Sequence, residues 1–152
     1  MNKKKLFLLH FAGGNSYSFQ FMQKELEKEF ELYALELPGR GRRLAEGLIV
    51  EFAKVVADYK TQILNVLNKN EPFAIYGHSM GATLGLRVAY ELEQAGFTPE
   101  CLVVTGNSGP GSYPSRKRYL LPSDDFMKEL RILGGVSEAF FESPELLEFF
   151  EP

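Results

Sequence analysis

Residues 73–82 read FAIYGHSMGA, and this stretch decides the fold. A short apolar run ends at Tyr76 and is followed by GHSMG at 77–81, which fits the pattern G-x-S-x-G, before a helix-like sequence begins at about Met80. In a sharp strand–turn–helix connection, the two glycines leave room for strand and helix to pass closely. The stretch therefore predicts Ser79 at the tip of a tight turn, with its hydroxyl at a helix N-terminus that favours negative charge.

The rest of the first hundred residues alternates short apolar runs with longer amphipathic stretches. Four runs are bounded by turn residues, as buried parallel strands are: 5–9, 32–36, 73–76 and 101–105. Apolar residues spaced for one face predict three helices between them: 19–30, 52–67 and 80–95. We also expect Gly96 to end the third helix in a left-handed conformation. Short strand–helix connections imply right-handed crossovers, so we predict an α/β fold, a mostly parallel sheet with helices on both faces.

The pattern changes after Gly106. Residues 107–120 are rich in Gly, Pro and Ser and predict a connecting loop, whereas 121–152 contains helical segments without strands. Ser123 is expected to cap one helix, with Asp124 and Asp125 in its first turn, and Ser143-Pro144-Glu145 to begin another. We therefore divide the chain into a partial core at 1–106, a loop at 107–120 and a less ordered helical cover at 121–152.

Composition excludes several classes of protein. The 152 residues carry 17 basic and 20 acidic side chains, a net charge of −3, which argues against a nucleic-acid binder. The one cysteine, Cys101, cannot form an internal disulfide and is expected to be a small core residue in a reducing compartment. The apolar run at the N-terminus ends near His10, is too short for a membrane span and lacks a cleavage site, so we predict a cytoplasmic protein. No cofactor or metal motif is visible.

Ser79 is the strongest candidate for chemistry. Gly77, His78 and Gly81 complete a predicted nucleophile elbow around it, and the N–H of Met80 would donate to an oxyanion. The alternative is a serine that only caps an ordinary helix.

A second candidate follows the first strand, where HFAGG at 10–14 could supply the other oxyanion donor from Ala12 or Phe11. A phosphate-binding loop is the rival interpretation, but neither G-x-G-x-x-G nor G-x-x-x-x-G-K-[ST] is present.

Four separated stretches together resemble the type II thioesterases of the α/β-hydrolase superfamily: LFLLHFAGGNSYSF at 6–19, ELPGRGRR at 36–43, GHSMGA at 77–82 and LPSDDFMKELRILGG at 121–135. These stand-alone enzymes serve nonribosomal peptide and polyketide assembly lines. The resemblance covers nearly the whole chain in order. It implies that Ser79 is acylated, that Met80 and Ala12 frame an oxyanion hole, and that residues from about 121 form a lid over the acyl channel. The partner it implies is an acyl or peptidyl carrier protein with a phosphopantetheine-linked acyl group. The arginines of 36–43 are expected to be structural.

One departure from the family is serious. A triad of this type runs Ser, Asp or Glu, then His along the chain, and no histidine follows Ser79. His78 should leave the turn in another direction, and His10 belongs to the oxyanion loop, so neither is a convincing base. We therefore expect the chain to be the amino-terminal part of a thioesterase, without the last strands of the sheet, and inactive alone.

Two other functions remain open from the sequence. The elbow alone does not distinguish a thioesterase from a general carboxylesterase. The missing base favours a non-catalytic fragment that binds carrier protein or acyl chain, and a basic cluster at 115–118 could meet an acidic carrier. Five aromatic residues of the last segment are expected to pack on the core or line an acyl tunnel: Phe126, Phe140, Phe141, Phe149 and Phe150.

Overall fold

The computed structural model describes residues 3–109, 120–134 and 138–143. It consists of two compact units, Met1–Asn107 and Ser108–Pro152.

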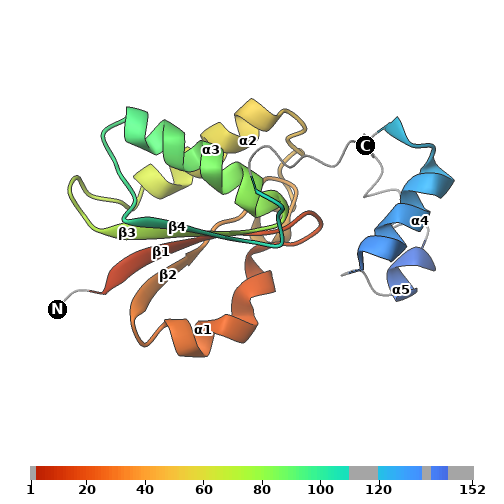
Figure 1. Cartoon of the computed structure of the whole chain (residues 1–152), viewed down its shortest axis with the longest axis horizontal. Helices are drawn as coiled ribbons and strands as arrows, with labels where there is room; N and C mark the ends of the chain where they lie inside the picture. The colour runs from red at the N-terminus through yellow and green to blue at the C-terminus, as the bar shows by residue number, and fades with distance from the viewer. Residues whose placement is uncertain (1–2, 110–119, 135–137, 144–152) are drawn as a thin grey trace. The chain divides into compact units, whose positions relative to one another are not determined.

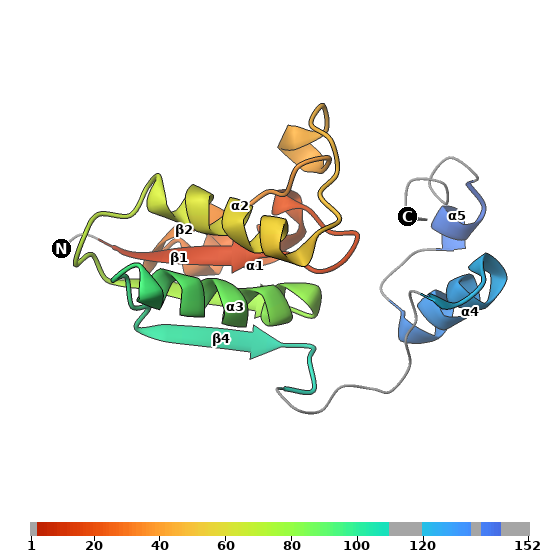
Figure 2. The ribbon, with the colours of Figure 1, turned by 90° about the horizontal axis from the view of Figure 1, so that it is seen from above.

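The first unit is built on four parallel strands in the order β2-β1-β3-β4 (Figure 1). They are β1 (Lys4–Leu9), β2 (Phe30–Ala34), β3 (Phe73–His78) and β4 (Cys101–Thr105). Helices α2 (Phe52–Leu64) and α3 (Met80–Gln94) cover one face, and α1 (Gln20–Leu26) covers the other (Figures 1 and 2). Two 3-10 turns complete the unit, η1 (Ser16–Phe19) and η2 (Gly41–Arg43). The predicted parallel α/β fold is confirmed.

Strand β1 shows how the two faces are filled. Phe7 and Leu9 are fully buried in the main core with α2 and α3, whereas Leu6 and Leu8 belong to a smaller cluster with Phe19 on the α1 face. Successive side chains of a strand point to opposite faces, so an uninterrupted apolar run fits a strand covered on both sides.

Two element boundaries differ from the sequence prediction. Helix α1 ends at Leu26, and Phe30, expected on its apolar face, is instead the first residue of β2. Strand β2 therefore runs over 30–34, in register with Lys4–Leu8 of β1, rather than over 32–36. Phe30 packs in the same cluster as Leu26. Neither its helical spacing nor its apolar environment therefore distinguishes a place at the end of α1 from a place at the start of β2. Gly96 does follow α3 with a positive φ of 83°.

The prediction that Cys101 is a core residue was wrong, because its side chain is exposed. It begins β4, which pairs only with β3 among the residues that the structure describes. Leu102 packs against the main core, but Val103 and Val104 are 46% and 47% exposed. An apolar strand at the edge of a sheet has the same sequence pattern as a buried strand, so the pattern alone does not predict its exposure.

In the second unit the structure describes α4 (Ser123–Leu133) and α5 (Glu138–Phe141). Asp124 and Asp125 lie in the first turn of α4, as expected, but Ser123 is its first helical residue and the capping position is Pro122, so the predicted serine cap was wrong. The guanidinium of Arg131 lies 4.5 Å from the ring centroid of Phe141. The basic cluster at 115–118, the predicted helix start at 143–145 beyond its first residue, Phe149 and Phe150 lie outside the described residues. Within the described ranges, no helix is long and apolar enough to cross a membrane.

Candidate active site

Ser79 lies at the junction of β3 and α3 in a strained backbone conformation. Its φ of 53° and ψ of −111° are unusual for a residue with a side chain; Asn70 is the one other non-glycine with positive φ among the described residues. The Ser79 N–H donates to the carbonyl of Thr105 at 2.9 Å, and its carbonyl accepts from Ala82 N–H at 3.0 Å. The predicted tight turn is confirmed. Strain of this kind persists where the surrounding structure holds it, and it clusters at active sites.

The two glycines of the elbow (Gly77–Gly81) allow backbone contacts that no side chain would permit. A Cβ on Gly77 would lie 2.1 Å from the carbonyl oxygen of Gly81, and a Cβ on Gly81 would lie 2.1 Å from that of Leu9. Backbone atoms of a sheet and helix cannot yield as a flexible side chain can. The first turn of α3 therefore abuts the end of β1, where the predicted oxyanion loop (His10–Gly14, below called the oxyanion loop) begins.

The oxyanion loop is itself a closed turn. The carbonyl oxygen of Phe11 accepts from Gly14 N–H at 2.9 Å and lies 3.0 Å from Nδ1 of His10. Gly13 has a positive φ of 77°, which a glycine adopts at little cost. The Phe11 ring meets the ring of His78 edge-on, with centroids 5.8 Å apart. The structure thus brings together the two stretches that the sequence singled out, with Ala12 exposed and Met80 at the start of α3.

Neither histidine is held as a base for Ser79. Nδ1 of His78 lies 2.9 Å from Oγ1 of Thr105, so the ring turns toward the end of β4. His10 is 1% exposed, and burial, the largest influence, lowers its pKa below 6.5. Its Nε2 is 3.8 Å from Oε1 of Glu36.

No site prediction from the sequence included Glu36, whose carboxylate is 2% exposed. It directly precedes LPGRGRR. The available signal was this position, because the glutamate follows a strand that ends inside the protein. Two arginines of this loop bind groups of the first unit: Arg42 donates to the carbonyl of Ala34 at 3.0 Å, and Arg43 binds two carboxylates. Arg43 binds Asp58 at 2.8 Å and Glu46 at 2.7 Å, and the hydrogen bonds that it donates to Glu46 and Asp58 raise its pKa. Among the described residues, no group of three His, Cys, Asp or Glu side chains could hold a metal ion.

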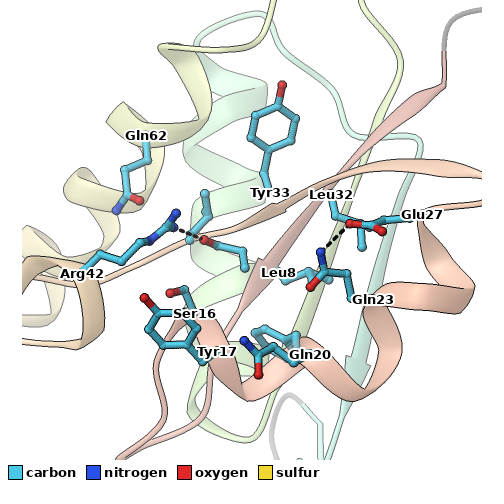
Figure 3. A pocket seen from close by; sticks show the side chains of 13 residues that line it. Leu8, Ser16, Tyr17, Gln20, Gln23, Glu27, Leu32, Tyr33, Arg42 and Gln62 are labelled. Carbon is cyan, nitrogen blue, oxygen red and sulfur yellow. Dashed lines mark hydrogen bonds between the residues drawn. The ribbon is translucent and has the colours of Figure 1, made fainter.

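A hollow of about 400 Å³ lies elsewhere in the first unit, along α1 and β2. Figure 3 shows Arg42 and Ser16 on one side of it and Gln23 with Glu27 on the other. None of the residues that line it belongs to the elbow or the oxyanion loop. Nothing in the sequence pointed to this hollow.

The family model described as the thioesterase domain matches residues 4–152. The chain belongs to the thioesterase family. It is 32% identical to the gramicidin S biosynthesis protein GrsT of Aneurinibacillus migulanus, over 99% of this chain and 59% of that protein. It is 34% identical to thioesterase PikA5 of Streptomyces venezuelae, over 95% of this chain and 51% of that protein. The chain thus spans between half and three fifths of these relatives.

Solved structures agree with this assignment. The type II thioesterase YbtT of the yersiniabactin pathway superposes with a TM-score of 0.86 at 29% identity, covering 98% of this chain and 60% of that one. RedJ, a thioesterase of the prodiginine pathway, gives a TM-score of 0.85 at 28% identity, over 98% and 59%. The predicted resemblance to type II thioesterases and the predicted α/β-hydrolase fold are both confirmed.

Proposed function

We propose that this thioesterase-family chain hydrolyses acyl or aminoacyl thioesters on the phosphopantetheine arm of carrier proteins, with Ser79 as the nucleophile. The observation that carries the proposal is the strained backbone of Ser79 at the N-terminus of α3, beside the oxyanion loop. Two solved relatives that are named for NRPS/PKS pathways, YbtT of the yersiniabactin pathway and ClbQ of the colibactin pathway, support the substrate class. The chain would act in the cytoplasm, with a carrier protein as its partner.

The proposed chemistry has two steps. The Ser79 oxygen adds to the thioester carbonyl and loses its proton to a base, while the N–H groups of Met80 and of Ala12 or Phe11 donate to the oxyanion. The C–S bond then breaks, the pantetheine sulfur leaves as the thiol with that proton, and an acyl-serine remains. Water adds to the acyl-serine in the same way and releases the acid.

The proposed site lacks an identified general base for Ser79 among the described residues. His78 is engaged by Thr105, and His10 faces Glu36, so neither described histidine is placed to take the Ser79 proton. Oxyanion stabilisation without a triad supports only about 10³–10⁴ over the reaction in water. We therefore expect the 152-residue chain to turn over slowly by itself.

The test is acylation of Ser79 by an acyl carrier protein, followed by intact-mass measurement under single-turnover conditions. We expect an acyl adduct on the wild-type chain and none on Ser79→Ala, with Thr98→Ala as a control at an exposed hydroxyl outside the site. An adduct that persists in Ser79→Ala would refute the assignment. Equal rates with a simple oxygen ester would favour a general carboxylesterase instead.

His78 contacts Thr105 and His10 faces Glu36, so neither is placed to act as a base. This favours a second candidate function, in which the chain binds carrier protein or acyl group without turnover. Carrier binding by wild type and Ser79→Ala alike, with no adduct on either, would identify it.

A further inference from the structure

We propose that Glu36 is a positioning residue of the oxyanion loop: its buried carboxylate anchors the chain at Ser16, just beyond this loop, packs beside His10 at its start, and so fixes the direction of the Ala12 N–H. The inference rests on the proposed function of Ser79.

The carboxylate binds Ser16, which begins η1 two residues beyond the loop. The Ser16 N–H donates to both carboxylate oxygens, at 3.2 Å from Oε1 and 3.1 Å from Oε2, and the Ser16 hydroxyl donates to Oε2 at 2.7 Å. The N–H of Arg42 adds a weaker contact at 3.3 Å. Three donors thus converge on a side chain that is 2% exposed. A buried carboxylate needs such donors, because a charge that is buried without hydrogen-bond partners is strongly destabilising.

His10 stands at the near end of the loop, facing the same carboxylate. Its Nε2 lies 3.8 Å from Oε1 of Glu36, beyond hydrogen-bond distance, and both side chains are buried, so the carboxylate limits the space open to the His10 ring. On the other side of the ring, Nδ1 lies 3.0 Å from the Phe11 carbonyl oxygen. A carbonyl oxygen only accepts, so Nδ1 carries the proton and donates.

The Phe11 carbonyl determines where the Ala12 N–H points. The two groups belong to one peptide unit, which is planar and trans, so that they point in opposite directions. His10 Nδ1–H and Gly14 N–H both hold this carbonyl. Fixing the carbonyl therefore fixes the donor that the proposed chemistry directs at the oxyanion.

Glu36 is itself anchored from outside the loop. Gln62 of α2 accepts from Glu36 N–H at 3.2 Å and donates to the Glu36 carbonyl at 2.8 Å, and Arg43 donates to the same carbonyl at 2.9 Å. The backbone of Gly41 lies directly against the carboxylate, since a Cβ there would come within 2.0 Å of Oε2. The carboxylate thus ties the loop to α2 and the sheet.

The decisive variant is Glu36→Gln, which keeps size and shape but replaces one acceptor oxygen with an NH₂ donor. In the place of Oε2 that donor faces the Ser16 and Arg42 N–H groups, and in the place of Oε1 it faces the Ser16 N–H, so at least one hydrogen bond from a backbone N–H is lost in either orientation. Losing one oxyanion donor outright costs about 10²–10³ in rate, and we expect misalignment to cost about tenfold. The loss should appear in the maximal rate of Ser79 acylation by acetyl-pantetheine, with the half-saturating concentration changed less than about twofold.

A second readout does not depend on catalysis. Amide hydrogen exchange of Ala12–Ser16 should accelerate in Glu36→Gln, while exchange in β3 stays unchanged. The matched control is Glu71→Gln, which removes the carboxylate that pairs with the buried Lys5 at the other end of β1. It should lower stability without changing loop exchange or the acylation rate.

Each outcome decides one question. Wild-type loop exchange and acylation rate in Glu36→Gln, or changes equal to those of Glu71→Gln, overturn the role of Glu36. If Glu36→Gln does not fold, Ser16→Ala tests the same role. We then expect faster loop exchange and slower acylation, and unchanged values would overturn the role of Glu36. Acylation that persists in Ser79→Ala would refute the proposed function alone, because loop exchange would still judge Glu36.

Discussion

The last residue of β4 holds the elbow: the carbonyl of Thr105 accepts the Ser79 N–H at 2.9 Å. The same residue contacts β3 through its side chain, whose Oγ1 lies 2.9 Å from both the Tyr76 hydroxyl and Nδ1 of His78. On the opposite side, Gly81 rests against the Leu9 carbonyl. The strained serine is therefore fixed between the carboxyl ends of β1 and β4, where ligands bind in open α/β sheets.

The hydroxyl of Thr105 should contribute measurably to stability. Thr105→Val keeps the backbone bond to Ser79 but removes the contacts to Tyr76 and His78. We expect the free energy of unfolding in urea to fall by about 1 kcal/mol, the usual worth of such hydrogen bonds. The control Thr98→Val, at an exposed position, should change it by less than about 0.5 kcal/mol. Equal values for the two variants would show that the Thr105 hydroxyl is dispensable.

Three glycines close in sequence should respond very differently to alanine. Gly77→Ala and Gly81→Ala force a Cβ to 2.1 Å from a backbone oxygen, and we expect losses of about 3 kcal/mol or more. In Gly85→Ala the nearest atom is the Cδ1 of Leu102, 3.3 Å away at the end of a flexible side chain. Helix propensity favours alanine there by about 1 kcal/mol, so Gly85→Ala should be nearly neutral. Thermal unfolding measures all three, and a tolerated Gly81→Ala would contradict the packing described for the elbow.

Much of this arrangement could be predicted from the sequence, because its signals are local. The elbow depends on two glycines around Ser79, and β1 on one continuous apolar run, so pattern and structure agree. Glu36 depends on partners from η1, η2 and the end of β1, and no spacing in the sequence shows that Ser16 and His10 will meet one carboxylate. The exposure of Cys101 depends on whether a strand lies beside β4, which the apolar letters CLVVT do not encode.

Stability should fall with acid because of His10. Its folded-state pKa lies below 6.5, lowered chiefly by burial and also by the charge of Arg40, against the opposing Phe11 carbonyl and Glu36. The unfolded chain binds a proton first as the pH falls through about 6.5, so stability is complete above that pH and is lost below it, by up to about 1.4 kcal/mol per pH unit. Urea unfolding of wild type and His10→Gln between pH 7.5 and 5.0 measures the difference. Parallel curves for both proteins would show that His10 does not titrate with folding.

Helix α4 should open more readily than the sheet. None of its described residues is buried, and Ile132 and Leu133 are exposed, whereas Phe73 and Ile75 of β3 are fully enclosed. Local opening costs least where few apolar contacts are lost. We expect α4 amides to exchange at least about 100-fold faster than those of β3, measured by hydrogen exchange with mass spectrometry. Equal protection would argue against a cover that moves independently of the core.

The edge of β4 that pairs with no strand among the described residues should make the 152-residue chain associate with itself. Such an edge presents N–H and C=O groups to any extended strand, and here it also carries the half-exposed Val103 and Val104. Val103→Lys places a charge on this edge, which should shift sedimentation of the chain at micromolar concentration toward the monomer. Leu86→Lys removes an apolar side chain of similar exposure, 50%, from the surface of α3 and should leave association unchanged. A wild-type chain that stays monomeric would refute the predicted association. Equal dissociation by both lysine variants would show that general surface hydrophobicity, rather than the β4 edge, governs it.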